Sequence, residues 1–171
     1  MNLIKLSIKK LNKEAIIPKY AKENDSGMDL YTLEDTVIEA HDTKVVKTGI
    51  AIQLQEGLEA QIRPRSGISL NGCKGCKYIE SNNEVTPTQL AYAVKHSNPY
   101  LRVQLGTIDC SYTGDIGIIT YNQEDNNVLI PKGTRLAQMV IAPVSNVEFI
   151  EVDKLEVTNR GESGFGSSGI N

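Results

Sequence analysis

Short β-prone segments recur along the chain, and turn-forming residues separate them. Apolar or alternating segments, many rich in Val and Ile, occupy residues 3–8, 37–38, 44–54, 58–63, 103–108, 116–121, 128–130 and 136–141. Gly, Asn, Asp or Pro marks turns at residues 55–57, 113–114, 124–127 and 131–133. β-branched residues favour strands, and no helix separates most of these segments. The spacing predicts an all-β domain, closed or sandwiched, rather than βαβ units.

Helical signals are confined to two stretches. Residues 87–96 begin with Pro87, which suits a first helical position, and place Leu90 and Val94 on one face. Residues 152–157 have room for one or two turns. Residues 70–102, rich in Gly, Asn, Ser and Pro, interrupt the strand pattern and are interpreted as a surface insertion.

Composition limits the possible partners. The chain has 171 residues, of which 40% are hydrophobic, enough for one domain with a core. A net charge of −3 gives no general attraction for nucleic acid. No apolar run approaches the ~20 residues that span a bilayer, and Met1 to Lys5 lack a signal-peptide core. We expect a cytoplasmic protein without nucleic-acid or membrane partners.

The chain has three cysteines, two of them in a C-x-x-C pair, Cys73 and Cys76. A tetrahedral zinc site would need two more ligands, for which His96 and Cys110 are the candidates. The other interpretations are a redox pair and two inert surface thiols. Because no second C-x-x-C is present, inert surface thiols are favoured.

The C-terminal residues 160–169 combine four glycines with Arg160, Phe165, Ser167 and Ser168. Such a segment is costly to order alone, so it is either a disordered tail or a segment ordered by a ligand. A cation, a ring and hydroxyls suit a nucleotide. Residues 164–169 also fit G-x-G-x-x-G, but no helix can follow, which excludes a dinucleotide-binding turn.

Two internal polar blocks carry candidate chemistry. Residues 63–69 end a strand with Arg65, Ser66 and Gly67, whose N–H groups could face phosphate; the alternative is a turn with solvated arginines. Residues 106–114 place Asp109 and Tyr112 in a candidate catalytic hairpin, where an acid can take a proton from water; the alternative is an Asp that caps a turn.

Two further polar residues lie in apolar surroundings. Asp29 is flanked by residues expected to be buried, which is unfavourable unless the acid is paired or faces a site. Gln138 lies inside the strand that follows the turn at residues 131–133.

Taken in order, residues 25–31, 63–69, 106–116, 133–139 and 160–169 resemble the five motifs of the trimeric deoxyuridine triphosphatase (dUTPase) family. The resemblance covers nearly the whole chain except the insertion. It implies hydrolysis of dUTP to dUMP and pyrophosphate, which limits uracil in DNA and supplies dUMP for thymidylate synthesis. It also implies a distorted jelly-roll-like β-barrel or sandwich, residues 1–158, and a flexible arm, residues 159–171, that closes over the site. The family forms homotrimers with three sites at the subunit junctions.

The resemblance also assigns roles to individual residues. Asp109 matches the general base that activates the attacking water, and Tyr112 the residue packed on deoxyribose. The hairpin lacks an Asn common in the family, so backbone groups at Gly106 and Ile108 would read the base. Asp29 matches an acid linked through water to Mg²⁺, the implied metal, which the triphosphate chiefly holds. Further contacts are implied for Arg65, Ser66, Gly67 and Gln138 with the phosphates, Arg160, Ser167 and Ser168 with the γ-phosphate, Phe165 with the uracil, and Gly166 with the substrate.

Two alternatives remain open at this point. A dCTP deaminase of the same fold would need a Glu after a Thr-Leu pair, where this chain has Ile118 to Tyr121, which weighs against it. A dUTPase could also bind a regulatory protein through residues 70–102, because loops on a rigid scaffold often carry added functions.

Overall fold

The computed structural model describes residues 4–79 and 98–161, and this part of the chain is nearly all β. It has thirteen strands and one short helix, α1. The strands are β1 (Ser7–Lys10), β2 (Lys19–Tyr20), β3 (Met28–Tyr31), β4 (Thr36–Ile38), β5 (Thr43–Lys47), β6 (Ile50–Gln53), β7 (Leu58–Pro64), β8 (Lys77–Ile79), β9 (Leu101–Val103), β10 (Gly106–Ile108), β11 (Gly117–Asn122), β12 (Asn127–Ile130) and β13 (Arg135–Pro143), with α1 at Ser66–Asn71. The predicted all-β class is confirmed.

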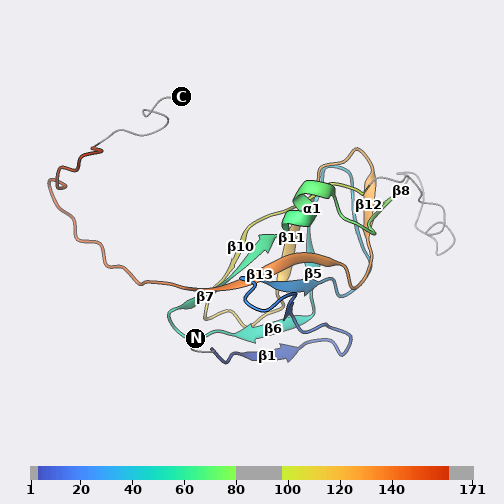
Figure 1. The fold of residues 1–171 in the computed structure, drawn as a ribbon, viewed down its shortest axis with the longest axis horizontal. Helices are drawn as coiled ribbons and strands as arrows, with labels where there is room; N and C mark the ends of the chain where they lie inside the picture. Colours follow the sequence, from blue (N-terminus) through green and yellow to red (C-terminus); the bar gives the residue numbers. More distant parts are fainter. Residues whose placement is uncertain (1–3, 80–97, 162–171) are drawn as a thin grey trace.

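Every strand pairing is antiparallel, and the largest sheet carries most of the residues that matter below. Its strand order is β10-β7-β13-β3-β2, so β13 lies between β7 and β3, with β10 at one edge. Smaller sheets have the orders β5-β11-β9, β4-β12-β8 and β1-β6. The described sheets form a jelly-roll-like fold without closing into a single barrel (Figure 1).

The core is aliphatic, as the scarcity of aromatic residues requires. Ile62 of β7, Ile118 of β11, Ile130 of β12 and Leu136 of β13 are each at most 1% exposed. In β11 the buried positions alternate with more exposed ones, which is the pattern of a strand with one face on a core. Burial of these branched side chains provides the main driving force for the fold.

Several sequence boundaries needed correction. The segment 44–54 is divided into β5 and β6 at Gly49, whose φ of 70° turns the chain. The segment 103–108 is likewise two strands, β9 and β10, and the first strand begins at Ser7 rather than residue 3. Strand β3, which carries Asp29, had no strand prediction.

The helix predicted for residues 152–157 is wrong. This segment has no regular secondary structure, and Val152 and Leu155 are 56% and 81% exposed. A helix this short is not stable without a packing partner, and in the single chain it has no core to pack on. The other predicted helix, residues 87–96, lies outside the described residues.

The prediction of surface thiols at Cys73 and Cys76 is also wrong. Both side chains belong to the core cluster, with exposures of 0% and 8%, and a disulfide joins them. The Cys73 N–H donates to the Pro99 carbonyl at 2.7 Å, so the two ends of the insertion lie together. Residues 4–79 and 98–161 contain no group of three or more potential metal ligands, and His96, one of the candidate zinc ligands, lies outside the described residues.

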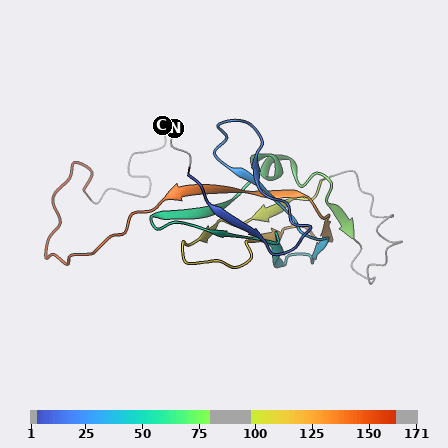
Figure 2. The ribbon, with the colours of Figure 1, turned by 90° about the horizontal axis from the view of Figure 1, so that it is seen from below.

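The chain beyond β13 leaves the strands. Figures 1 and 2 show residues 144–161 running away from the body in both views. Phe149 and Val157 in this segment are 93% and 88% exposed. Neither side chain belongs to the hydrophobic core cluster of the chain.

Candidate active site

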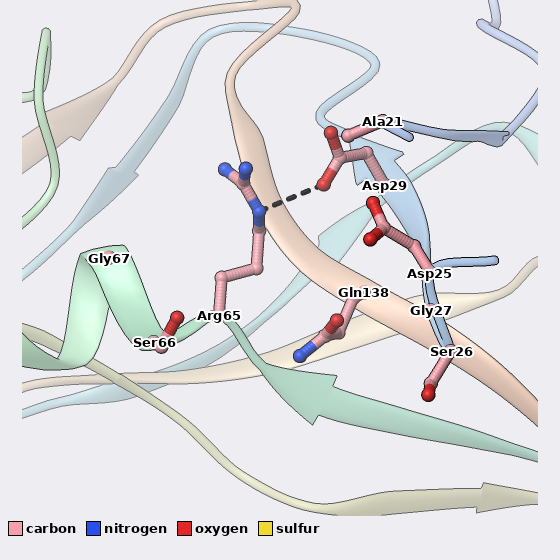
Figure 3. A pocket seen from close by; sticks show the side chains of 9 residues that line it. All are labelled: Ala21, Asp25, Ser26, Gly27, Asp29, Arg65, Ser66, Gly67 and Gln138. Atoms are coloured by element: carbon pink, nitrogen blue, oxygen red, sulfur yellow. Dashed lines mark ion pairs between the residues drawn. The ribbon is translucent and has the colours of Figure 1, made fainter. Parts of the chain in front are cut away.

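A cleft of about 250 Å³ brings together three of the five sequence blocks. It lies where β3, β13 and the junction of β7 with α1 meet (Figure 3). Its lining is largely polar. The residues are Ala21, Asp25, Ser26, Gly27, Asp29, Arg65, Ser66, Gly67 and Gln138.

Asp29 is the buried acid of the cleft, and two arginines hold it. Its Oδ1 lies 2.9 Å from Nε of Arg65, and its Oδ2 lies 3.2 Å from Nη1 of Arg135. The Asp29 side chain is only 9% exposed, against 26% for Arg65 and 53% for Arg135. The sequence expectation that this acid is paired or faces a site therefore holds in both respects.

Arg65 presents its guanidinium to the cleft at the start of α1. Nη1 of Arg65 donates to the carbonyl of Arg135 at 2.8 Å, while Nε faces Asp29 (Figure 3). A guanidinium has five N–H donors, and these two contacts use two of them. The side chain is thus oriented while retaining donors for an anion.

Residues 63–69 were interpreted as a strand end whose following N–H groups could face phosphate, or as a strand-ending turn. Arg63 and Pro64 do end β7, but α1 rather than a turn begins at Ser66. The N–H groups of Ile68 and Ser69 both donate to the Arg65 carbonyl at 3.0 Å. Ser66 and Gly67 occupy the first turn, where backbone N–H groups have no carbonyl partner within the helix. A Cβ placed on Gly67 would meet no atom within 4 Å, so packing does not require this glycine.

Gln138 crosses the cleft from β13. Its Nε2 donates to the Pro64 carbonyl at 2.9 Å, which directs the amide oxygen toward Gly27. A Cβ on Gly27 would lie 2.5 Å from that oxygen. A side chain at residue 27 would therefore require the Gln138 amide to move.

The hairpin with Asp109 is well braced. The Asp109 carbonyl accepts from the Tyr112 N–H at 3.0 Å, and the Tyr112 hydroxyl donates to the Asp115 carbonyl at 2.9 Å. Asp115 in turn accepts from the Gly49 N–H at 2.9 Å, which ties the hairpin to the β5–β6 junction. The Asp109 side chain itself is exposed, and Tyr112 is 45% exposed.

The hairpin and the cleft lie at different ends of the large sheet. Ile108, just before Asp109, pairs with Ala60 of β7, whereas Arg65 follows the far end of the same strand. At ~3.3 Å per residue, the two positions are roughly 16 Å apart along β7. Neither Asp109 nor Tyr112 lines the cleft. Within residues 4–79 and 98–161, the single chain does not bring all the predicted site residues together.

Strand β10 is an edge strand of the large sheet and contains Gly106 and Ile108. They pair with Ile62 and Ala60 of β7 on one side. An edge strand has a second row of peptide groups that the ladder does not use. Of the C-terminal residues, Arg160 is described and exposed, whereas Phe165, Gly166, Ser167 and Ser168 lie outside the described residues.

The sequence interpretation did not single out five residues here: Ala21, Asp25, Ser26 and Gly27, which line the cleft, and Arg135, which contacts Asp29. All but Ala21 lie within the first and fourth blocks, so proximity to Asp29 and Gln138 was the available signal. The described residues contain no group of three or more acidic, Cys or His side chains that could enclose a metal. Within the same residues, no helix is long and apolar enough to cross a membrane.

A family model described as dUTPase matches residues 13–88 and 92–169. The chain belongs to the dUTPase family. The deoxyuridine 5′-triphosphate nucleotidohydrolase of Gloeothece citriformis is 42% identical over 167 residues, which are 98% of each chain. The Clostridioides difficile protein of the same name is 39% identical and covers 96% of this chain and 98% of its own. The reaction of the present chain is accordingly the hydrolysis of dUTP to dUMP and pyrophosphate.

Solved structures agree with this assignment. The dUTPase of Staphylococcus bacteriophage 80alpha, with dUPNHPP, has a TM-score of 0.77 and 28% identity, covering 97% of this chain and 99% of its own. The phage phi11 enzyme, at 22% identity and a TM-score of 0.70, supports the fold alone. A structural Mg(II) ion is coordinated in that phage phi11 protein.

Proposed function

We propose that the cleft binds the triphosphate of dUTP. The β10 hairpin binds the deoxyuridine and supplies the general base that activates the attacking water. Arg65 and the first-turn N–H groups of Ser66 and Gly67 form the anion-binding wall, with Gln138 opposite. The observation that carries this proposal is the oriented but incompletely used guanidinium of Arg65 beside the open face of Gly67.

The base of the reaction is Asp109. Its exposed carboxylate on a braced hairpin can orient a water molecule and accept its proton as the oxygen attacks the α-phosphorus. The bond from the α-phosphorus to the bridging oxygen breaks, and pyrophosphate leaves. Tyr112, on the same hairpin, packs against the sugar, and the free edge of β10 at Gly106 and Ile108 reads the uracil.

Mg²⁺ is the proposed cofactor, and the donor set of the cleft fits an ion held mainly by substrate. Among the described residues, the cleft offers two carboxylates, Asp25 and Asp29, and Asp29 already contacts two arginines. Such a site suits an ion that keeps most of its waters and contacts Asp29 through one of them. When bound, it neutralises phosphate charge.

The active unit is a homotrimer in which neighbouring chains complete each site. Two observations support this proposal: the ~16 Å between the hairpin and the cleft within one chain, and the exposed apolar segment 144–161 that leaves the body (Figure 1). The arm, including Arg160, Phe165, Gly166, Ser167 and Ser168, would close over a neighbour's site and exclude water. We further propose a cytoplasmic location, in keeping with the sequence expectation.

The test is pyrophosphate release from dUTP compared with dTTP, dCTP and UTP, with and without Mg²⁺. Selective, Mg²⁺-dependent release from dUTP is expected. Ammonia release from dCTP would instead indicate the deaminase reaction, and equal rates with UTP would refute the role of Tyr112 against the sugar.

A regulatory partner at residues 70–102 is a second candidate. The 80alpha dUTPase, 28% identical, is described as controlling transfer of virulence genes. Deletion of residues 73–99 would remove β8 and two core cysteines, so it would confuse folding with binding. Replacing only residues 80–97 with a short linker keeps β8 and the two core cysteines. Unchanged turnover would favour a partner, and lost turnover would indicate that the insertion serves the site.

A further inference from the structure

Strand β13 contains a β-bulge beside the cleft. Arg135 pairs with Tyr31 of β3 and Ala137 pairs with Leu30, so Leu136 is an extra residue in the ladder. Leu136 and Ala137 are both fully buried, which breaks the alternation of the strand.

This bulge determines which side chains of β13 lie on the same side of the sheet as Asp29. Gln138 lies opposite Asp29, and Arg135 lies opposite Tyr31, which is on the same face of β3 as Asp29. In a regular strand, residues three apart point to opposite faces. The extra Leu136 therefore allows Arg135 to contact Asp29 from the same side of the sheet as Gln138.

Arg135 makes two different contacts from this position. Its guanidinium lies 3.2 Å from Oδ2 of Asp29, and its carbonyl accepts from Nη1 of Arg65 at 2.8 Å. Asp29 uses its other oxygen for Nε of Arg65 at 2.9 Å. Arg135 thus holds Arg65 directly through its backbone and indirectly through Asp29.

We propose that Arg135 is a positioning residue for phosphate binding by Arg65. The inference rests on the proposed role of Arg65 at the triphosphate. Without Arg135, the charge of Asp29 would be balanced by Arg65 alone, and the guanidinium would be less available to an anionic substrate. With it, the three side chains carry one net positive charge, and the carboxylate is fixed at both oxygens.

The experiment compares Arg135→Gln, Arg135→Lys and the control Arg102→Gln. Arg102 is an exposed cation on β9 away from the cleft, so its variant removes the same charge. We expect Arg135→Gln to raise KM for dUTP, and Kd for the imido analogue dUPNHPP, by about 10-fold, with kcat changed less than about 2-fold. Arg135→Lys should recover most of the affinity, and Arg102→Gln should match wild type. Melting temperatures verify folding.

A double-mutant cycle with Arg65→Gln tests whether Arg135 acts through Arg65. In the Arg65→Gln background, adding Arg135→Gln should weaken dUPNHPP binding by less than about 2-fold. Fully additive losses, or an Arg135→Gln variant that matches Arg102→Gln, would overturn the inference while leaving dUTP hydrolysis intact. A wild-type enzyme that fails to bind dUPNHPP would refute the proposed function, and this inference with it.

Discussion

At the residue scale, substitutions at Asp109 and Gly67 test the catalytic step and substrate binding separately. Asp109 has an exposed side chain, and its hairpin is held by other groups, so within the described residues the fold does not depend on the Asp109 carboxylate. Asp109→Asn keeps the shape and removes the base, so kcat should fall by at least ~10² with dUPNHPP affinity nearly unchanged. Single-turnover rates and calorimetric titration measure the two quantities. Retained turnover would place the base elsewhere.

Gly67→Ala gives the complementary result. A Cβ there meets open space, and alanine favours a helix over glycine by roughly 1 kcal/mol, so stability should stay level or rise. The methyl group would nevertheless stand where phosphate approaches the N–H groups, so Kd for dUPNHPP should rise by about 10-fold or more. Thermal unfolding and titration of the same sample provide the test. Normal affinity would exclude the first turn of α1 from the phosphate site.

At the element scale, one buried amide connects three chain segments. The Asn122 Nδ2 donates to the carbonyls of Ile38, Glu39 and Asn126 at 3.1, 2.9 and 2.9 Å, and its Oδ1 accepts from the Glu124 N–H at 3.1 Å. Asn122 is 0% exposed, so its removal leaves buried carbonyls without this donor.

Asn122→Ala should therefore lower the free energy of unfolding by about 2–3 kcal/mol. Denaturant titration measures the change, and the exposed neighbour in Gln123→Ala is the control, expected within about 0.5 kcal/mol of wild type. Equal stability of the two variants would show that the amide network contributes little to the fold.

At the scale of the whole molecule, the prediction concerns shared sites. A chain ending at Thr158 keeps Asp109 and lacks Phe165, whereas full-length Asp109→Asn keeps Phe165 and lacks the general base. Each homotrimer should be nearly inactive, and co-refolding should restore activity because mixed trimers pair an intact base with an intact arm. Mass spectrometry of the intact trimers verifies mixing. Mixed trimers as inactive as their components would mean that the arm folds onto its own subunit.

The sequence by itself determined the all-β class, most strand positions and the residue types of the site. Alternation and turn residues are local signals, which is why β7, β11 and β12 were predicted within a residue or two. Local signals also failed where packing decides. Residues 152–157 lack a core to support a helix, and Cys73 is buried because its side chain packs in the hydrophobic core, which no local pattern shows.

Only the tertiary structure decided which of these residues meet. Alternation alone places Arg135 and Gln138 on opposite faces of β13, whereas the bulge at Leu136 places both on the side of the sheet that carries Asp29. Register likewise puts Asp109 and Arg65 at opposite ends of β7, although both were predicted for one site. Bulges and register arise from pairing between distant segments. A short stretch of sequence cannot show that pairing, because the partner residues are far apart in the chain and stabilise each other only in the assembled sheet.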